Sequence, residues 1–153
     1  MKTLLTCCFL LFVHMTIAQN AFDDMTNEKI QKILYREAQD VQGQLGAWQF
    51  TYQELMAMIL TDENANSMRI MSPIIEEKDI KEEQYKLMLE ANFDRALDAK
   101  YAVFDGIVWS VFTHPLAELE VEQFKDALDQ VITLSKTFGT TYNSTDFVFG
   151  GGN

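Results

Sequence analysis

Cysteine is scarce in this chain, and both cysteines, Cys7 and Cys8, lie within the first 18 residues. Removal of that segment would exclude disulfides, zinc–thiolate sites and thiol nucleophiles. His114 is the one histidine beyond the same segment, and no serine lies in a Gly-x-Ser-x-Gly sequence. A nucleophilic dyad or triad therefore has little to build on, and we expect a non-enzymatic protein without catalytic residues, cofactor or metal.

Positive charge is also scarce, since 12 Lys and Arg residues face 23 Asp and Glu residues and give a formal net charge of −11. An acidic surface repels the phosphates of nucleic acids and of anionic lipids, so nucleic acid is not expected as a partner. The chain has two prolines and no internal repeat. Its 153 residues predict one domain that is large enough to bury a core of its own.

The first 18 residues have the pattern of a secretory signal peptide. A short start with Lys2 is followed by an apolar run from Leu4 to Ala18 and then by polar Gln19. We expect cleavage between Ala18 and Gln19 and a protein that is exported, either to the periplasm or out of the cell. As a helix the run would span roughly 22 Å, too short for a stable membrane insertion. Two alternatives stay open, namely an uncleaved anchor and a lipobox, which Leu4-Leu5-Thr6-Cys7 faintly resembles.

After a linker over residues 19–25, helical and strand patterns alternate within a single domain over residues 26–142. Apolar spacing of three and four predicts helices from an N-cap at Thr26 out to Gly43 or Gly46, from Glu82 through Ala96, and from Glu118 to Phe138. Alternating or continuous apolar runs, and an Asp105-Gly106 turn, predict strands over residues 48–52, 54–61, 67–74, 100–104 and 107–112, with Pro73 marking the end of the third.

The expected order is α-β-β-β-α-β-β-α. Because the strands come in consecutive groups, this order predicts an α+β fold with a five-stranded antiparallel sheet and three helices, mainly on one side of the sheet. The stripe of Tyr85, Met88, Leu89, Asn92, Phe93 and Ala96 on the second helix is expected to be buried, with the following hairpin as its nearest partner. Residues 143–153, which end in Gly-Gly-Gly-Asn, are expected to form a flexible tail in which Phe147, Val148 and Phe149 could dock.

Four features together resemble the type III secretion chaperone-like superfamily, including its YbjN-like branch. They are the expected α-β-β-β-α-β-β-α order itself, the run Leu87 to Asn92, the hairpin from Lys100 to Phe112 around Asp105-Gly106, and His114-Pro115-Leu116 before the last helix. The resemblance covers about residues 28–138. It implies a small, acidic, non-enzymatic and commonly dimeric protein, and the secretion chaperones of this group wrap an unfolded segment of a client around their surface. For an exported chain, the resemblance implies the scaffold and the binding of polypeptide.

Apolar residues lie on both faces of the predicted sheet. If helices cover one face, the other must be covered by a polypeptide client, by a second copy in a homodimer, or by the tail. Methionine suits a surface that accepts varied apolar partners, and the hairpin from Leu55 to Met71 is rich in it. The candidate partner-binding residues are Met56, Met58, Leu60, Met68, Ile70, Trp109 and Val111. The alternative is that all of these residues are ordinary core.

Other patterns predict different roles. Trp48, Phe50, Trp109 and Phe112 could line a cavity for a small apolar ligand of the cell envelope. An enzyme would need a carboxylate close to His114. The sequence Asp62-x-Asn64-x-Asn66 imitates the start of a calcium loop, but Ser67 and Pro73 stand where glycine and glutamate are required, which favours a solvated turn. Asn143-Ser144-Thr145 fits a glycosylation sequence.

Overall fold

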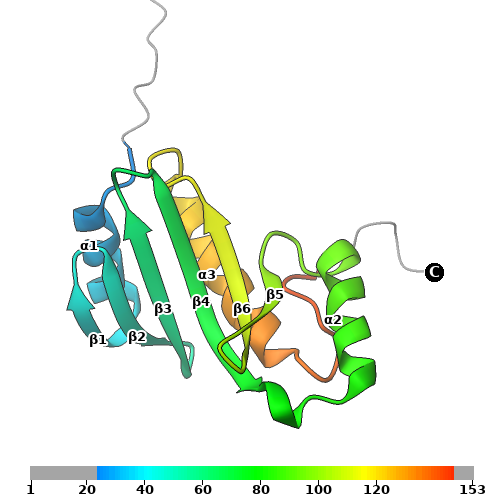
Figure 1. Cartoon of the computed structure of the whole chain (residues 1–153). Coiled ribbons are helices and arrows are strands. Elements are labelled where there is room, and N and C mark those ends of the chain that lie inside the picture. Colours follow the sequence, from blue (N-terminus) through cyan, green and yellow to red (C-terminus); the bar gives the residue numbers. More distant parts are fainter. Residues whose placement is uncertain (1–23, 147–153) are drawn as a thin grey trace, which may run out of the picture.

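The structure, a computed structural model, describes residues 24–146 (Figure 1). The expected signal peptide, its cleavage site and residues 147–153 lie outside the described part. That part is an α+β domain with three α-helices and one six-stranded antiparallel sheet. No helix within it is long and apolar enough to cross a membrane. The elements are α1 (Asn27–Glu37), β1 (Gln39–Gln44), β2 (Ala47–Tyr52), β3 (Leu55–Asp62), β4 (Ser67–Glu76), α2 (Glu82–Asp94), β5 (Lys100–Phe104), β6 (Ile107–His114) and α3 (Val121–Lys136), with a 3₁₀ turn η1 (Glu77–Asp79) before α2.

The prediction of five strands is wrong by one, because residues 39–44 form strand β1 and not the end of the first helix. Helix α1 starts as expected, with the Thr26 hydroxyl accepting from the N–H of Lys29, but it ends at Glu37. Asp40 and Gly43 then take left-handed φ angles of 52° and 115°, which an α-helix does not tolerate. A side chain at Gly43 would also lie 2.2 Å from the Ala47 carbonyl oxygen. The observed order is therefore α-β-β-β-β-α-β-β-α.

The six strands lie in the order β1-β2-β3-β4-β6-β5, and every neighbouring pair is antiparallel. The Asp105-Gly106 turn joins β5 and β6 as predicted, with φ angles of 52° and 71°. A second two-residue turn, Gln53-Glu54, also has two positive φ angles but contains no glycine. The side chain of Gln53 is held by α3, because it donates to Asp129 Oδ1 at 2.7 Å and accepts from Lys136 Nζ at 3.2 Å.

Pro73 does not end the third predicted strand, which is the fourth strand of the sheet and runs on to Glu76. The strand passes through Pro73 with an irregularity between Pro73 and Ile75 in its pairing with β6. Beside this proline, which has no N–H to offer, the Ser72 hydroxyl donates to the Met56 carbonyl oxygen at 2.8 Å. A side chain thus supplies a bond across β3 and β4 next to the missing donor.

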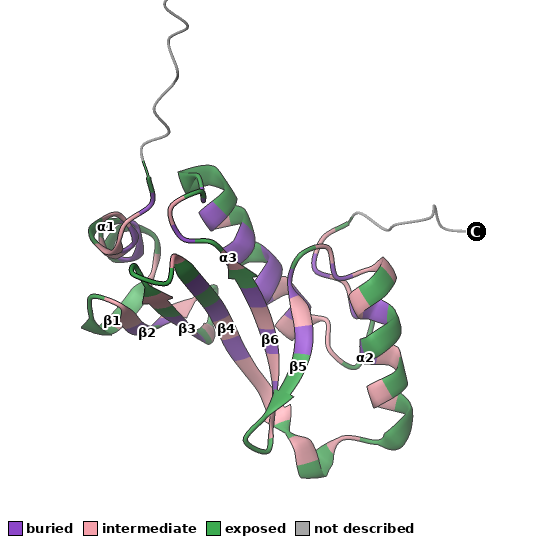
Figure 2. Ribbon diagram, turned by 45° about the horizontal axis from the view of Figure 1, so that its top comes forward, coloured by how far each residue is buried: buried purple, intermediate pink, exposed green. Residues whose placement is uncertain are grey.

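Helices α1 and α3 lie on one face of the sheet, behind it in Figure 1. Figure 2 shows buried segments on these helices and on the strands that they cover. Helix α3 packs against β4, β5 and β6. The core between these layers is made of fully or nearly fully buried side chains, among them Ile30, Leu34, Trp48, Phe50, Ile59, Met68, Ile70, Phe112, Phe124, Leu128 and Leu134.

Helix α2 lies beyond the β5 edge of the sheet (Figure 1), and its expected stripe is only partly buried. Met88 is 4% exposed and Ala96, just past the helix, is 2% exposed. Leu89 and Phe93, however, are 70% and 87% exposed. The prediction that the whole stripe is buried is therefore wrong, because α3 packs against β6 while α2 packs mainly against the edge strand β5.

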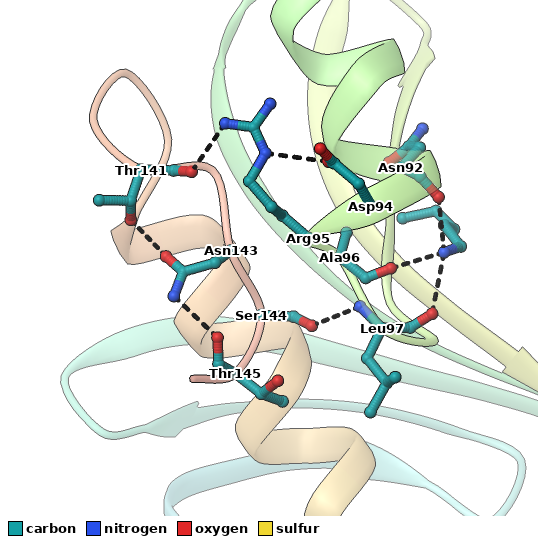
Figure 3. Close-up of polar contacts among 10 residues, drawn as sticks. Asn92, Asp94, Arg95, Ala96, Leu97, Thr141, Asn143, Ser144 and Thr145 are labelled. Carbon is teal, nitrogen blue, oxygen red and sulfur yellow. Dashed lines mark hydrogen bonds and ion pairs between the residues drawn. The ribbon is translucent and has the colours of Figure 1, made fainter. Parts of the chain in front are cut away.

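The folded part of the chain extends past residue 142, where the sequence predicted a tail. Tyr142 and Ser144 are 3% and 2% exposed. The Ser144 hydroxyl accepts from the N–H of Leu97 at 2.8 Å (Figure 3), and the Ser144 N–H donates to the Arg95 carbonyl oxygen at 3.2 Å. The segment after α3 therefore belongs to the domain at least as far as Ser144, and it fastens the connection between α2 and β5.

Candidate functional site

We call the side of the sheet that faces away from α1 and α3 the open face. Strand pairing aligns one row of its residues across five strands, and this row consists of Gln49, Met58, Met71, Val111 and Lys100. Met56 and Leu60, on either side of Met58 in β3, also point to this face and are 40% and 42% exposed. The open face thus carries an apolar centre that the described part of the chain leaves in contact with solvent.

The structure brings together five of the seven candidate partner-binding residues on the open face, namely Met56, Met58, Leu60, Trp109 and Val111. The other two, Met68 and Ile70, point to the opposite face and are 1% and 0% exposed. They lie in the core and are not available to a partner. The length of the turn between β3 and β4 could have separated them, because Asp62 pairs with Ser67 and this closing pair sets Met71, not Met68 or Ile70, opposite Met58.

Sequence reasoning missed the charged residues of the open face. Arg69, exposed on β4, has no hydrogen-bond or ion-pair partner among the described residues. Lys100, on β5, donates from Nζ to the carbonyl oxygens of Asn92, Ala96 and Leu97 at 2.6 to 2.9 Å. Burial lowers the pKa of Lys100 from its usual value, and the charge of Asp98 acts in the opposite direction. Arg69 is therefore the cation of this face that is left for a partner.

The four aromatic residues of the predicted ligand cavity do not lie together. Trp48, Phe50 and Phe112 are buried at 2%, 1% and 7% exposure on the side of α1 and α3. Trp109 lies on the open face, where its indole N–H donates to the Phe104 carbonyl oxygen at 3.1 Å. Since the sheet separates Trp109 from the other three side chains, the four cannot line one cavity.

The two edges of the sheet are less available than its open face. At the β5 edge, the side chain of Asn92 accepts from the N–H of Tyr101 at 2.7 Å and donates to its carbonyl oxygen at 3.1 Å. At the other edge, the positive φ angle of Asp40 and an irregular register between Gln39 and Gln42 interrupt β1. Bulges and side-chain caps of this kind discourage the addition of a further strand.

A pocket of about 360 Å³ lies next to His114, at the end of β6. Its lining includes the carboxyl groups of Asp98 and Asp126. His114 Nδ1 lies 2.7 Å from the Pro115 carbonyl oxygen, and its ring stacks on Phe112 with centroids 6.1 Å apart. Asp126 accepts from the buried amide of Gln130 at 2.6 Å. Among the described residues, no hydrogen bond joins His114 to a carboxylate.

The residues that imitate a calcium loop form a turn that contacts the chain before α3. Asp62 Oδ1 accepts from the N–H groups of Asn64 and Ala65, and Asn66 donates to Glu118 Oε2 at 2.8 Å while accepting from the N–H of Ala117. These bonds involve the oxygens of Asp62 and Asn66 in local contacts. Within residues 24–146, no group of three or more His, Cys, Asp or Glu side chains is placed to hold a metal ion.

The described part of the chain thus defines an α+β domain with one covered and one open sheet face. No family model matches the chain. No curated protein matches it either.

Proposed function

We propose that this is an exported, non-enzymatic protein-binding module, and that its open face holds a polypeptide client. The observation that carries the proposal is the apolar centre of that face, with Met56 and Leu60 each at least two-fifths exposed within an otherwise acidic protein. The resemblance to secretion chaperone-like proteins supports the same class of function. The signal-peptide pattern supports a periplasmic or secreted location.

The size of the open face favours a client that is held weakly or transiently. Five strands at a spacing of about 4.8 Å, each contributing about six residues of about 3.3 Å, give a footprint of roughly 400 Å². A standard protein interface buries about 800 Å² on each partner. A face of this size suits an extended or helical segment of a client better than an obligate subunit.

The charge of the face favours a client over a second copy. Arg69 is an unpaired cation beside the apolar centre, and it would gain most from a carboxylate on the partner. Two copies would each bring their own Arg69 to the interface, and each chain carries a formal net charge of −11. We therefore expect the client segment to be apolar with at least one acidic residue.

Binding of peptides to the purified full chain tests this proposal. Immobilised apolar peptides of about 12 residues, with and without a central Asp, are compared on the wild-type protein and on L60E, R69E and Y35E. Tyr35 is 66% exposed on α1, so Y35E is a matched control away from the open face. L60E should weaken all binding about tenfold or more by introducing a charge into the apolar centre, and R69E should abolish the preference for acidic peptides.

Binding that L60E and Y35E weaken equally would place the peptide elsewhere and overturn the proposal. Light scattering, which measures the oligomeric state, tests whether a second copy of the chain occupies the open face instead of a client. A dimer that L60E dissociates and Y35E does not would make a second copy the occupant of the open face in place of a client.

A further inference from the structure

We propose that the segment Phe147-Val148-Phe149 docks on the outer side of α2, over Leu89 and Phe93. These two side chains are among the most exposed large apolar groups of the described residues. They are one helical turn apart and belong to a groove of about 500 Å³ with Lys86, Glu90, Asp94 and Arg95. This groove is separate from the open face of the sheet, so the inference does not depend on the proposed client.

Hydrogen bonds hold the segment that precedes Phe147 next to this groove. Just past the end of α2, Ser144 is hydrogen-bonded to the Leu97 N–H (Figure 3) and to the Arg95 carbonyl oxygen. Arg95 Nη1 also donates to the Thr141 carbonyl oxygen at 3.5 Å. The segment that follows therefore starts beside the C-terminal end of the helix, and its local concentration at the groove is high because it is tethered there.

The lengths match. From Ser144 to Phe149 an extended chain covers about 16 Å, whereas Arg95 lies only about 9 Å along the helix axis from Leu89. In an extended segment Phe147 and Phe149 point to the same side about 6.6 Å apart. Leu89 and Phe93 are about 6 Å apart along the helix. Phe147 would thus meet Phe93 and Phe149 would meet Leu89, with Val148 turned away.

The charges around the groove favour an uncharged occupant. Lys86 Nζ lies 3.6 Å from Glu90 Oε1, and Arg95 Nε lies 2.9 Å from Asp94 Oδ1, so the rim is paired within itself. Residues 147–153 contain no charged side chain. The open face differs, because its unpaired Arg69 favours an acidic partner.

Disulfide trapping tests the docking in the full chain carrying C7S and C8S, which leaves no native thiol to compete. The pair L89C and F149C should form an intramolecular disulfide at least about tenfold faster than L89C with V148C, because a disulfide needs Cα atoms within about 7 Å and correctly directed side chains. The V148C pair is a matched control with nearly the same tether. Equal rates would overturn the inference.

Two other outcomes would also overturn it. A faster disulfide between M56C and F149C would place the segment on the open face, and a disulfide mainly between two chains would make a second copy the occupant of the groove. As a measurement without cysteines, the double variant F147S and F149S should speed amide hydrogen exchange in α2 about threefold or more, whereas V148S should not. Unchanged exchange in the double variant would contradict docking.

Discussion

The two faces of the sheet are built from the same strands and differ in every second residue. On the covered face Ile59 and Ile70 pair across β3 and β4 and are both completely buried. On the open face the neighbouring residues Met58 and Met71 also pair, yet they remain partly accessible. At this pair of positions the covered face thus has branched side chains of fixed shape, and the open face has methionines that can adapt to a partner.

The largest difference between the two faces is expected when one side chain of β4 on each face is shortened to alanine. Ile70→Ala should lower the free energy of unfolding by about 2–5 kcal/mol, because it leaves a cavity beneath α3. Met71→Ala should lower it by about 1 kcal/mol or less, because the site is already open to water. Urea denaturation of the two variants measures both. Equal losses would mean that the open face is covered in solution.

Tyr101 of β5 sharpens the comparison through pH. Tyr101, on the covered face, donates from its hydroxyl to the Leu134 carbonyl oxygen at 2.9 Å, and burial raises its pKa well above the usual value. The stability from this raised pKa is fully present below about pH 10 and is lost as the pH rises further, because only the unfolded tyrosine then ionises readily.

Tyr101→Phe should therefore cost about 1 kcal/mol near neutral pH, by removing one of the two hydroxyl bonds to the Leu134 carbonyl oxygen and leaving only that from Thr137 at 3.3 Å, and should flatten the loss of stability above pH 10. Thermal unfolding between pH 7 and pH 11 measures both effects. Tyr35→Phe, at an exposed position of α1, is the control and should change neither. A steep alkaline loss that persists in Y101F would assign it to another group.

A smaller effect is expected at the turn between β2 and β3, which is anchored only from the covered side. Glu54→Gly should stabilise the protein by about 0.5–1 kcal/mol, because glycine adopts a φ of 73° without strain. Gln53→Gly is the matched comparison. It relieves similar strain but loses the bonds to Asp129 and Lys136, so it should give no net gain. Chemical denaturation distinguishes the two, and a gain in both variants would show that those bonds contribute little.

The smallest expected effect is a difference in solvent access between the two tryptophans, one on each face of the sheet. Trp48 is 2% exposed beneath α1 and α3, whereas Trp109 lies on the open face. Acrylamide should quench the fluorescence of W48F, which retains Trp109, several times more efficiently than that of W109F. Equal quenching would contradict the difference in access. A peptide that binds the open face should protect W48F and leave W109F unchanged.

The sequence predicted the class of the fold because most of its elements have strong local signals. The Asp105-Gly106 turn and the alternation of Trp48, Phe50 and Tyr52 lead to a hairpin and a strand in the structure. Strand β1 was missed because Val41 and Leu45 continue the helical spacing of α1, and nothing in the local pattern reveals the extended backbone at Ala38 that ends the helix or the positive φ angle of Asp40. Tertiary contacts override local preference there.

The candidate site was predicted in part for a related reason. Alternation along one strand places Met58 and Ile59 on opposite faces of the sheet. Which residues of a neighbouring strand share a face with Met58 depends on the register of strand pairing. Met68 and Ile70 were therefore grouped with residues from which the sheet separates them. The two most exposed residues of α2, Leu89 and Phe93, were expected in the core because an apolar stripe shows which residues share a helix face, not whether another element reaches it.

The bonds of Ser144 have a consequence for biosynthesis. A ribosome makes the chain from its N-terminus, so the serine that holds Arg95 and Leu97 is among the last described residues to emerge. The strands can pair earlier, but the junction between α2 and β5 is completed only once Ser144 has been made. A translation product that stops before residue 144 would therefore display an unfinished corner, which quality-control proteases can recognise.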